Sequence, residues 1–304
     1  MIGQDNQGSV ERALASCAWA DEIVFVDGGS SDATAEIARA SGARVYVRPF
    51  DYTAHQKNYC LARATGEWTF LLDTDEVISP ELAAEVRAIA SRPIPDYSLY
   101  HAPRKLIDHR RWLPCCGTYP DWQLRFFRTG HYALELRRAH AGGVFAEPVG
   151  KLRHPILHYS FHDLDSHMRR ITDRTTLSAL DYYERGCRPR GPFLFLKFFF
   201  TFWHEYCTRG GVRCGVPGLM YAAVRAVESF SKYAKVWELA NDTSALDLSW
   251  ELAHKQAADL ALLADELQPQ LLREWARQNL PTPPVVAPDS VAVPVEVGSL
   301  SGSE

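Results

Sequence analysis

Two short apolar runs that end in carboxylates place the strongest constraint on the fold. Residues 22–27 (EIVFVD) end at Asp27 and are followed by two glycines, and residues 68–72 (WTFLL) lead into the acidic sequence DTDE. Each run is short enough for a buried strand, and a helix-like stretch follows each of them. Strands that alternate with helices in this way predict an α/β fold, with a mostly parallel sheet and helices on its faces.

The rest of the chain divides by pattern. A Ser-Pro pair predicts the start of a helix over residues 79–91, with serine as the N-cap and proline in the first turn. Residues 97–160 are aromatic and strand-like, without a helical period. We therefore expect four segments: a catalytic domain at 1–160, a helical basic-aromatic region at 161–240, an acidic amphipathic helix at 241–278 and a disordered tail at 279–304.

The charge is small overall and uneven along the chain. A net charge of −4 argues against a dedicated nucleic-acid binder, so no nucleic-acid partner is expected. Residues 101–154 carry a net charge of +6 and residues 188–238 carry +5, whereas residues 241–304 carry −7. The two basic segments predict that an anionic partner docks on the middle of the chain.

The cysteines argue against a disulfide-rich protein and a structural zinc site, and the longest apolar run argues against a membrane-spanning helix. Seven cysteines without the close spacing of a disulfide framework favour reduced thiols. His204, Cys207 and Cys214 lack the fourth ligand at short spacing that a structural zinc site needs. The run at residues 193–203 is eleven residues long, and a spanning helix needs about 20. No transmembrane segment is predicted.

The carboxylates that follow the strands are the first candidates for a site, because ligands bind at the carboxyl ends of strands in open α/β sheets. Asp73 and Asp75, two residues apart, are expected on one face, where a divalent cation such as Mg²⁺ would relieve their repulsion. The alternative is an acidic turn that caps the next helix. Asp27 is followed by Gly28 and Gly29, which allow the backbone to approach a ligand closely.

Two other groups of polar residues are candidates. Lys57 and Asn58 lie near the start of a predicted helix, where a basic side chain and free N–H groups suit phosphate; the alternative is an exposed helix face. Asp121, Gln123 and Arg125 lie in an aromatic segment that suits a sugar ring, with a carboxylate available as a general base. The alternative for this segment is a structural strand with a buried tryptophan.

Several ordered motifs resemble one family. The chain is similar to the inverting family 2 glycosyltransferases of GT-A fold, in particular to those of lipopolysaccharide-core and polysaccharide biosynthesis in Gram-negative bacteria. The resemblance spans roughly residues 6–240. It rests on VDGGSSDAT (26–34), HQKN (55–58), LLDTDEVISPEL (71–82), YPDWQLRFFR (119–128), HPILHYSF (154–161) and KYAKVWEL (232–239).

This resemblance implies a GT-A-like α/β fold and metal-assisted transfer of a hexose or related sugar, with inversion, from a nucleotide-sugar (a UDP-sugar first among them) to a lipid-linked glycan. It also implies a cytoplasmic enzyme, peripheral on the inner membrane, that uses Mg²⁺ or Mn²⁺. The implied roles are donor binding for Asp27, Gly29, Lys57, Asn58 and Asp73, metal binding for Asp75, the acceptor side for Gln123 and Arg125, and the general base for Asp121.

The chain departs from the family pattern in two places. Relatives begin with a complete strand and a Thr/Tyr-Asn-Glu-like turn, whereas here only residues 5–7 match the turn and most of the strand is missing. This departure predicts a misassigned start or an incomplete nucleotide pocket. Where relatives carry a glutamate after His140, this chain has Ala141, so the base is expected to be Asp121 or Glu147. The alternative function is a catalytically silent membrane scaffold or nucleotide-sugar-binding protein.

The basic-aromatic region at 188–238 also fits the resemblance. Lys and Arg beside Phe and Trp suit the interface of an anionic membrane, and a lipid-linked acceptor would bring the protein there. The alternative is a packed helical pair whose cations extend from apolar stems into water.

Overall fold

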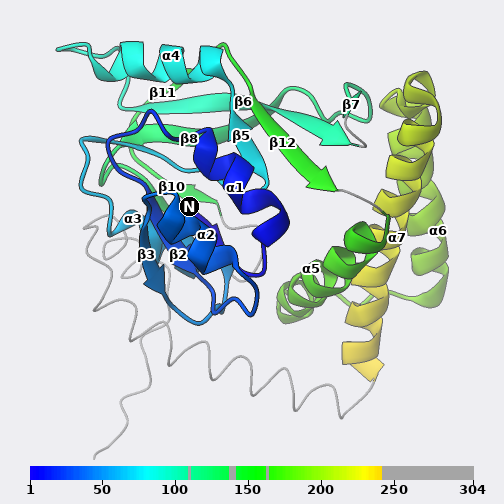
Figure 1. Ribbon diagram of the computed structural model, residues 1–304. Helices are drawn as coiled ribbons and strands as arrows, with labels where there is room; N and C mark the ends of the chain where they lie inside the picture. Colours follow the sequence, from blue (N-terminus) through cyan, green and yellow to red (C-terminus); the bar gives the residue numbers. More distant parts are fainter. Residues whose placement is uncertain (109–110, 137–141, 162–163, 242–304) are drawn as a thin grey trace, which may run out of the picture.

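The computed structural model describes residues 1–108, 111–136, 142–161 and 164–241 of the 304-residue chain. Its strands all lie between Ile2 and Phe161, and three longer helices follow them (Figure 1). The acidic helix expected to reach residue 278 and the tail that follows it lie outside the described residues, as do His140 and Ala141.

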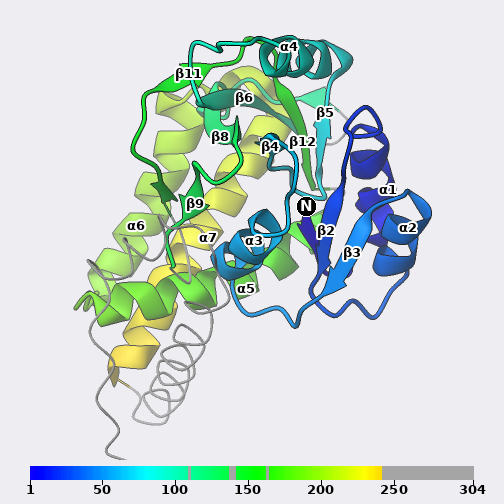
Figure 2. The ribbon, with the colours of Figure 1, turned by 90° about the vertical axis from the view of Figure 1, so that its left-hand side faces the viewer.

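A small parallel sheet forms the first part of the fold, as the sequence predicted. All its neighbouring strands run parallel, in the order β1 (Ile2–Gly3), β2 (Val24–Asp27) and β3 (Arg44–Val47). Helices cover both faces, with α1 (Gln7–Ala15) and α2 (Thr34–Ala40) on one side and α3 (Thr53–Leu61) on the other (Figure 2). Every residue of β2 is buried, which agrees with its apolar sequence.

A second, larger sheet is mixed. Its central order is β4-β8-β6-β12-β5, with β7 and β11 also pairing with β6. Among the described strands of this sheet, only β6 with β12 and β6 with β11 run parallel, because short connections rather than crossover helices join most of these strands. The bounds are β4 Trp68–Phe70, β5 Glu76–Ile78, β6 Leu99–Asp108, β7 Arg111–Trp112, β8 Asp121–Arg128, β11 Val149–Lys151 and β12 Ile156–Phe161. A hairpin of β9 (Ala133–Leu134) and β10 (Gly143–Val144) lies apart.

Helix α4 (Pro80–Ala90) and a shared apolar core pack against the sheets near β4. The helix begins as predicted, since the Ser79 hydroxyl accepts a hydrogen bond from the Leu82 amide at 3.2 Å. Phe126 of β8 stacks on Trp68 of β4 with ring centroids 4.7 Å apart. The principal core also contains Leu14, Phe25, Leu72, Leu82 and Ile156, each 2 % exposed or less.

Helices α5 (Leu164–Glu184), α6 (Gly191–Trp203) and α7 (Gly215–Asn241) form a group beside the sheets (Figures 1 and 2). A π-helical turn (His204–Thr208) and a 3₁₀ turn (Gly211–Cys214) join α6 to α7. Tyr233 of α7 contacts the rings of Tyr182 and Phe193 edge to face, at 5.7 and 5.1 Å. Among the described helices, none has the length and apolar character needed to cross a membrane.

A disulfide joins the sheet region to the helices and corrects one expectation. Cys115, in the loop after β7, is bonded to Cys214 in the 3₁₀ turn, although the sequence analysis expected reduced thiols. The two cysteines are 99 positions apart, so local spacing gave no sign of the pair. In the part of the chain that the structure describes, no three His, Cys, Asp or Glu side chains gather as a metal site.

The N-terminal residues form the edge strand of the first sheet. β1 has two residues, and the α-ammonium group of Met1 donates to the Val24 carbonyl at 2.6 Å in a buried position. A cavity of about 530 Å³ adjoins Met1 and lies between the start of β2 and β4, lined there by Val24, Trp68 and Phe70. The turn at residues 5–7 packs on the loop after β2, where the Asp5 carboxylate accepts from the Ser31 amide at 2.7 Å.

Candidate functional site

Asp27 ends β2 and shapes the turn that follows it. Its Oδ2 accepts hydrogen bonds from the amides of Gly29 and Ser30 at 3.0 and 2.9 Å, and its Oδ1 accepts from the Ser30 hydroxyl at 2.5 Å. Gly29 has a φ of +90°, a conformation that disfavours other residues. The carboxylate therefore holds the loop at the end of β2, and contact with a nucleotide remains a prediction for both residues.

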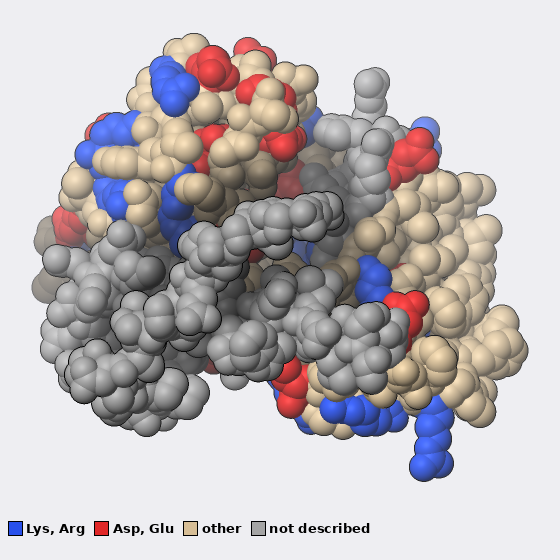
Figure 3. Space-filling view, turned by 90° about the horizontal axis from the view of Figure 1, so that it is seen from below, with Lys and Arg blue, Asp and Glu red and all other residues tan. Residues whose placement is uncertain are grey.

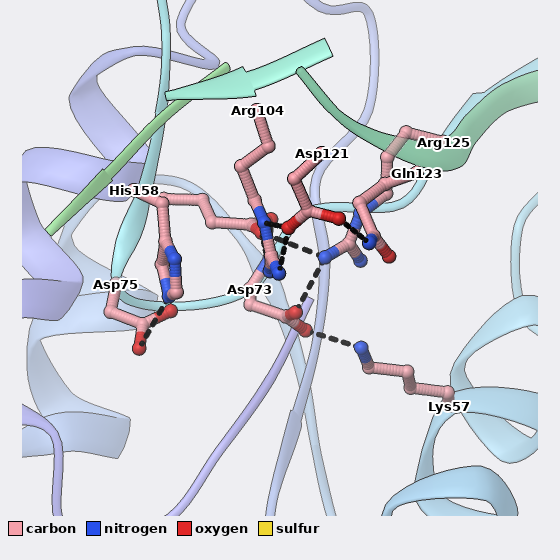
Figure 4. A network of polar contacts seen from close by, with 9 residues as sticks. Lys57, Asp73, Asp75, Arg104, Asp121, Gln123, Arg125 and His158 are labelled. Atoms are coloured by element: carbon pink, nitrogen blue, oxygen red, sulfur yellow. Dashed lines mark hydrogen bonds and ion pairs between the residues drawn. The ribbon is translucent and has the colours of Figure 1, made fainter. Parts of the chain in front are cut away.

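Two of the predicted residues, Lys57 and Arg125, meet at a third, Asp73. Lys57 of α3 forms an ion pair with Asp73 Oδ1 at 2.6 Å, and Arg125 of β8 donates from Nη2 to Asp73 Oδ2 at 2.7 Å (Figure 4). The Asp73 side chain is 25 % exposed, whereas that of Arg125 is 5 % exposed. Each oxygen of Asp73 thus contacts a different cation, at an edge that the solvent reaches.

Glu76 contacts both arginines of this site and the backbone of Asp73, although the sequence analysis treated it only as part of an acidic turn. Its side chain is fully buried, and Oε1 accepts from Arg125 Nη2 at 2.7 Å and from Arg104 Nη1 at 3.1 Å. Its Oε2 accepts from the amide of Asp73 at 3.1 Å. Glu76 therefore fixes two arginines and the backbone of the acidic turn in one arrangement.

Asp121, the predicted base, lies at the start of β8 beside this group. Its Oδ2 accepts from Nε and Nη2 of Arg104, at 2.9 and 2.5 Å, and its Oδ1 accepts from Gln123 Nε2 at 2.7 Å (Figure 4). The side chain of Asp121 is 36 % exposed. Sequence reasoning missed Arg104, because a lone arginine in an aromatic strand carries no local signal.

The charges of this network stabilise one another. Burial alone would raise the pKa of Asp73, but Arg125 and Lys57 outweigh it and hold that pKa well below its usual range. Burial opposes the charged form of Arg125 as well, yet Asp73 and Glu76 keep its pKa above the usual arginine value. Burial likewise opposes the charged form of Arg104, and Glu76 and Asp121 outweigh it and raise the pKa of Arg104. Asp73, Arg104 and Arg125 are therefore charged at neutral pH.

Asp75 contacts a different partner from Asp73, although the sequence analysis expected the two carboxylates on one face. β4 ends at Phe70, and residues 73–76 form a turn in which the Glu76 amide donates to the Asp73 carbonyl at 3.0 Å. Asp75 Oδ2 lies 3.4 Å from Nε2 of His158, which comes from β12 (Figure 4). A carboxylate and an imidazole are donor types that bind Mn²⁺ and related divalent cations, so this pair fits a metal ion.

Asn58 and Glu147 lie apart from the network. Asn58 is 1 % exposed, and its side-chain amide both donates to the Leu134 carbonyl at 2.8 Å and accepts from the Leu134 amide at 2.9 Å. It therefore holds β9 against α3. Glu147, the alternative base, pairs with His131 at 2.7 Å.

The comparisons with known proteins agree with these observations. The model of the family "Glycosyl transferase family 2" matches residues 6–138. The lipopolysaccharide core biosynthesis glycosyltransferase LpsC of Rhizobium meliloti (strain 1021) is 30% identical over 250 residues, covering 76% of this chain and 87% of that protein. An uncharacterized glycosyltransferase of Rickettsia bellii (strain RML369-C) is 25% identical over 250 residues, covering 79% and 85%.

Solved structures show a distant similarity. S. aureus TarS 1-349 in complex with UDP-GlcNAc is 15% identical, with a TM-score of 0.41, and the match covers 79% of this chain and 89% of that one.

The family and the fold therefore agree with the sequence analysis. The similarity to LpsC extends over most of both chains, and the family model includes the turn at residues 5–7 only in part but covers Asp27, Asp73 and Asp121. The α/β arrangement of two sheets with flanking helices confirms the expected GT-A-like fold. The chain is a glycosyltransferase related to those of lipopolysaccharide core biosynthesis, and it belongs to glycosyl transferase family 2.

Proposed function

We propose that this glycosyltransferase moves a hexose or related sugar from a nucleotide-sugar, a UDP-sugar first among the candidates, to a lipid-linked glycan of the lipopolysaccharide core or another surface polysaccharide. The observation that carries the proposal is the group of Lys57, Asp73 and Arg125 beside the Asp75–His158 pair. The relationship to LpsC supports the choice of acceptor class. The reaction takes place at the cytoplasmic face of the inner membrane, with the protein peripheral on it.

The donor binds between α3 and the acidic turn. Lys57 has three ammonium hydrogens, so it retains donors for a phosphate oxygen while it contacts Asp73. Asp73 is an anion at neutral pH and accepts a hydrogen bond from a ribose hydroxyl. Asp27 and Gly29 shape the loop on the base side of the nucleotide, and Asn58 acts through the position of β9.

Asp75 and His158 would hold a divalent cation, Mg²⁺ or Mn²⁺. When bound, the ion neutralises the charge that develops on the diphosphate leaving group.

Asp121 acts as the base toward the acceptor. The acceptor hydroxyl oxygen attacks the anomeric carbon from the side opposite the diphosphate, so the bond to the diphosphate breaks with inversion, and the proton passes to Asp121. Arg104 keeps that carboxylate oriented, and Gln123 next to it contacts the acceptor. The contacts with Asp73 and Glu76 hold Arg125 in place between the donor and the acceptor.

Calorimetry with a panel of nucleotide-sugars tests the donor site. The wild type, Asp75→Ala and the control Asp96→Ala would each be titrated with Mg²⁺ or Mn²⁺ and again with chelator. Asp96 is an exposed carboxylate paired with Arg92, so it controls for the loss of one negative charge. We expect metal-dependent binding of one donor by the wild type and the control, and its loss in Asp75→Ala.

Binding of no donor, or binding that chelator and Asp75→Ala leave unchanged, would contradict this site. A transfer assay with a lipid-linked glycan extract then separates the two functions. Donor binding without transfer to any acceptor would favour the catalytically silent alternative.

A further inference from the structure

The outer face of α6 is apolar and uncovered by the described residues. Phe195, Leu196, Phe199, Phe200 and Trp203 are each between 53% and 64% exposed. At the helical repeat of 3.6 residues per turn, these five positions fall on one side of the helix. Large apolar side chains rarely gather in one exposed patch on a soluble protein unless the patch meets a partner.

The opposite side of α6 accounts for its packing on α7. Phe198 faces Phe230 edge to face at 6.5 Å, and the Thr201 hydroxyl donates to the Ser229 hydroxyl at 3.3 Å. The packed helical pair, given in the sequence analysis as the alternative to a membrane interface, therefore exists, but only the inner side of α6 packs in it. The outer face is additional to that packing.

Positive charge surrounds the apolar face. Residues 185–213 contain six Lys or Arg residues and a single acidic residue, Glu205, which is buried and pairs with Arg209. Arg190, at the N-terminus of α6, and Arg213, in the turn after it, are both exposed. In Figure 3 the side of the molecule where α6 and α7 lie is broadly uncharged, with Lys and Arg as well as a few Asp and Glu at its margin.

We infer that this face of α6 binds an anionic lipid bilayer. The aromatic and leucine side chains enter the boundary between headgroups and acyl chains, while Arg190 and Arg213 contact the lipid phosphates. Trp203 lies at the end of the helix, where an indole ring suits the headgroup level. This inference rests on the proposed transfer to a lipid-linked acceptor, and it names the surface that brings the site to that acceptor.

Vesicle flotation of the full chain tests the surface without donor, metal or acceptor, so its result is independent of the proposed reaction. Vesicles of phosphatidylcholine alone are compared with an equal mixture of phosphatidylcholine and phosphatidylglycerol. We expect at least about tenfold stronger binding to the anionic vesicles, because two or more arginines contribute. The double variant Leu196→Asn/Phe199→Asn should lose that binding, and Ile94→Asn, at an 87% exposed apolar site far along the chain, should keep it.

Two further measurements make the test specific. Arg190→Gln/Arg213→Gln should reduce the preference for anionic vesicles, and brominated lipid should quench the fluorescence of the wild type more than that of Trp203→Phe. Far-ultraviolet circular dichroism and urea unfolding serve as the folding controls for each variant, so the control does not depend on donor binding. Absence of vesicle binding, or binding that the α6 variants leave unchanged, would overturn the inference. So would a sedimentation result in which the same variants only dissociate a dimer.

Discussion

Arg104 binds Asp121 through two N–H groups that both donate to the same oxygen, Oδ2, at 2.9 and 2.5 Å. The other oxygen, Oδ1, accepts only from the side-chain amide of Gln123 among the contacts described, at 2.7 Å. The arginine contact is doubled and partly buried, whereas the glutamine contact is single. We therefore expect an acceptor hydroxyl to replace Gln123 on Oδ1 while Arg104 keeps the carboxylate in place.

The first prediction separates the two candidate bases. Asp121→Asn should lower kcat by about 10²- to 10⁴-fold, the usual contribution of a general base, and leave donor affinity unchanged. Glu147→Gln should leave kcat near the wild-type value, because Glu147 pairs with His131 outside the network. Initial rates and calorimetry on both variants check this. A large loss in Glu147→Gln with normal activity in Asp121→Asn would reverse the assignment.

The second prediction concerns the buried charges. Arg125→Met should lower the free energy of unfolding by about 3–5 kcal/mol, because it leaves Asp73 and Glu76 without their shared cation. Adding Glu76→Gln to that variant should restore part of the loss, since it removes the negative charge that the loss of Arg125 leaves in excess.

Urea unfolding measures these differences. Arg128→Met is the matched control, because Arg128 is 31 % exposed and its partner Glu67 is 66 % exposed. A partly exposed pair of this kind contributes about 0–1 kcal/mol. Equal effects of Arg125→Met and Arg128→Met would show that the network contributes nothing beyond a surface pair.

The sequence predicted those parts of the site that lie close together in the chain. Ser79 caps its helix, and Asp27 ends its strand at a glycine turn, because such signals act within a few residues. Lys57 and Asp73 were each predicted as donor-binding residues from their own segments, but the ion pair between them was not predicted.

Contacts between distant segments could not be predicted in the same way. His158 meets Asp75 only because β12 pairs with β5, and Arg104 meets Asp121 only through the register of β6 with β8. Neither register is encoded by local propensity, and the same holds for the bond between Cys115 and Cys214. The separation of Asp73 from Asp75 also depended on where β4 ends, which a continuous apolar run does not reveal.

The third prediction addresses the metal. His158→Gln should weaken Mn²⁺ binding by about ten- to a hundredfold, because it removes the imidazole beside Asp75. His131→Gln, which changes a histidine paired with Glu147, should have no such effect. Titration of Mn²⁺ followed by electron paramagnetic resonance measures the affinity directly and needs no turnover. Unchanged affinity in His158→Gln would exclude that residue as a ligand.

The fourth prediction is a loss of stability in acid that depends on Asp51. Burial favours a higher pKa for this carboxyl, but hydrogen bonds from Arg48 and His55 outweigh it and lower the pKa. Because the folded pKa is lower than the unfolded value of about 3.9, the contribution to stability is full above that value and is lost as the pH falls through the folded pKa.

Unfolding free energies measured between about pH 7 and pH 2 should therefore decline less steeply for Asp51→Asn than for the wild type. Asp21→Asn, an exposed carboxyl for which no partner contact is described, is the control and should follow the wild-type curve. Parallel curves for wild type and Asp51→Asn would contradict the role of Asp51.

The last prediction uses the cavity beside Met1. The α-ammonium group of Met1 is buried and donates to the Val24 carbonyl, and the cavity continues from it between β2 and β4. A few apolar, β-branched residues added before Met1 would convert the ammonium into a peptide N–H that still donates to Val24. Their side chains would enter a space lined by Val24, Trp68 and Phe70, and each buried side chain contributes about 1.5–3 kcal/mol.

Ordering each added residue costs about 1–2 kcal/mol, so a net gain requires that the new segment pairs as a strand and fills the cavity. We expect the apolar extension to raise Tm, and an extension of equal length made of glycine and serine to leave Tm unchanged or lower it. Differential scanning calorimetry on the two proteins and the unextended chain measures the difference. A rise of equal size with both extensions would show that removal of the buried charge, rather than the shape of the cavity, accounts for the gain.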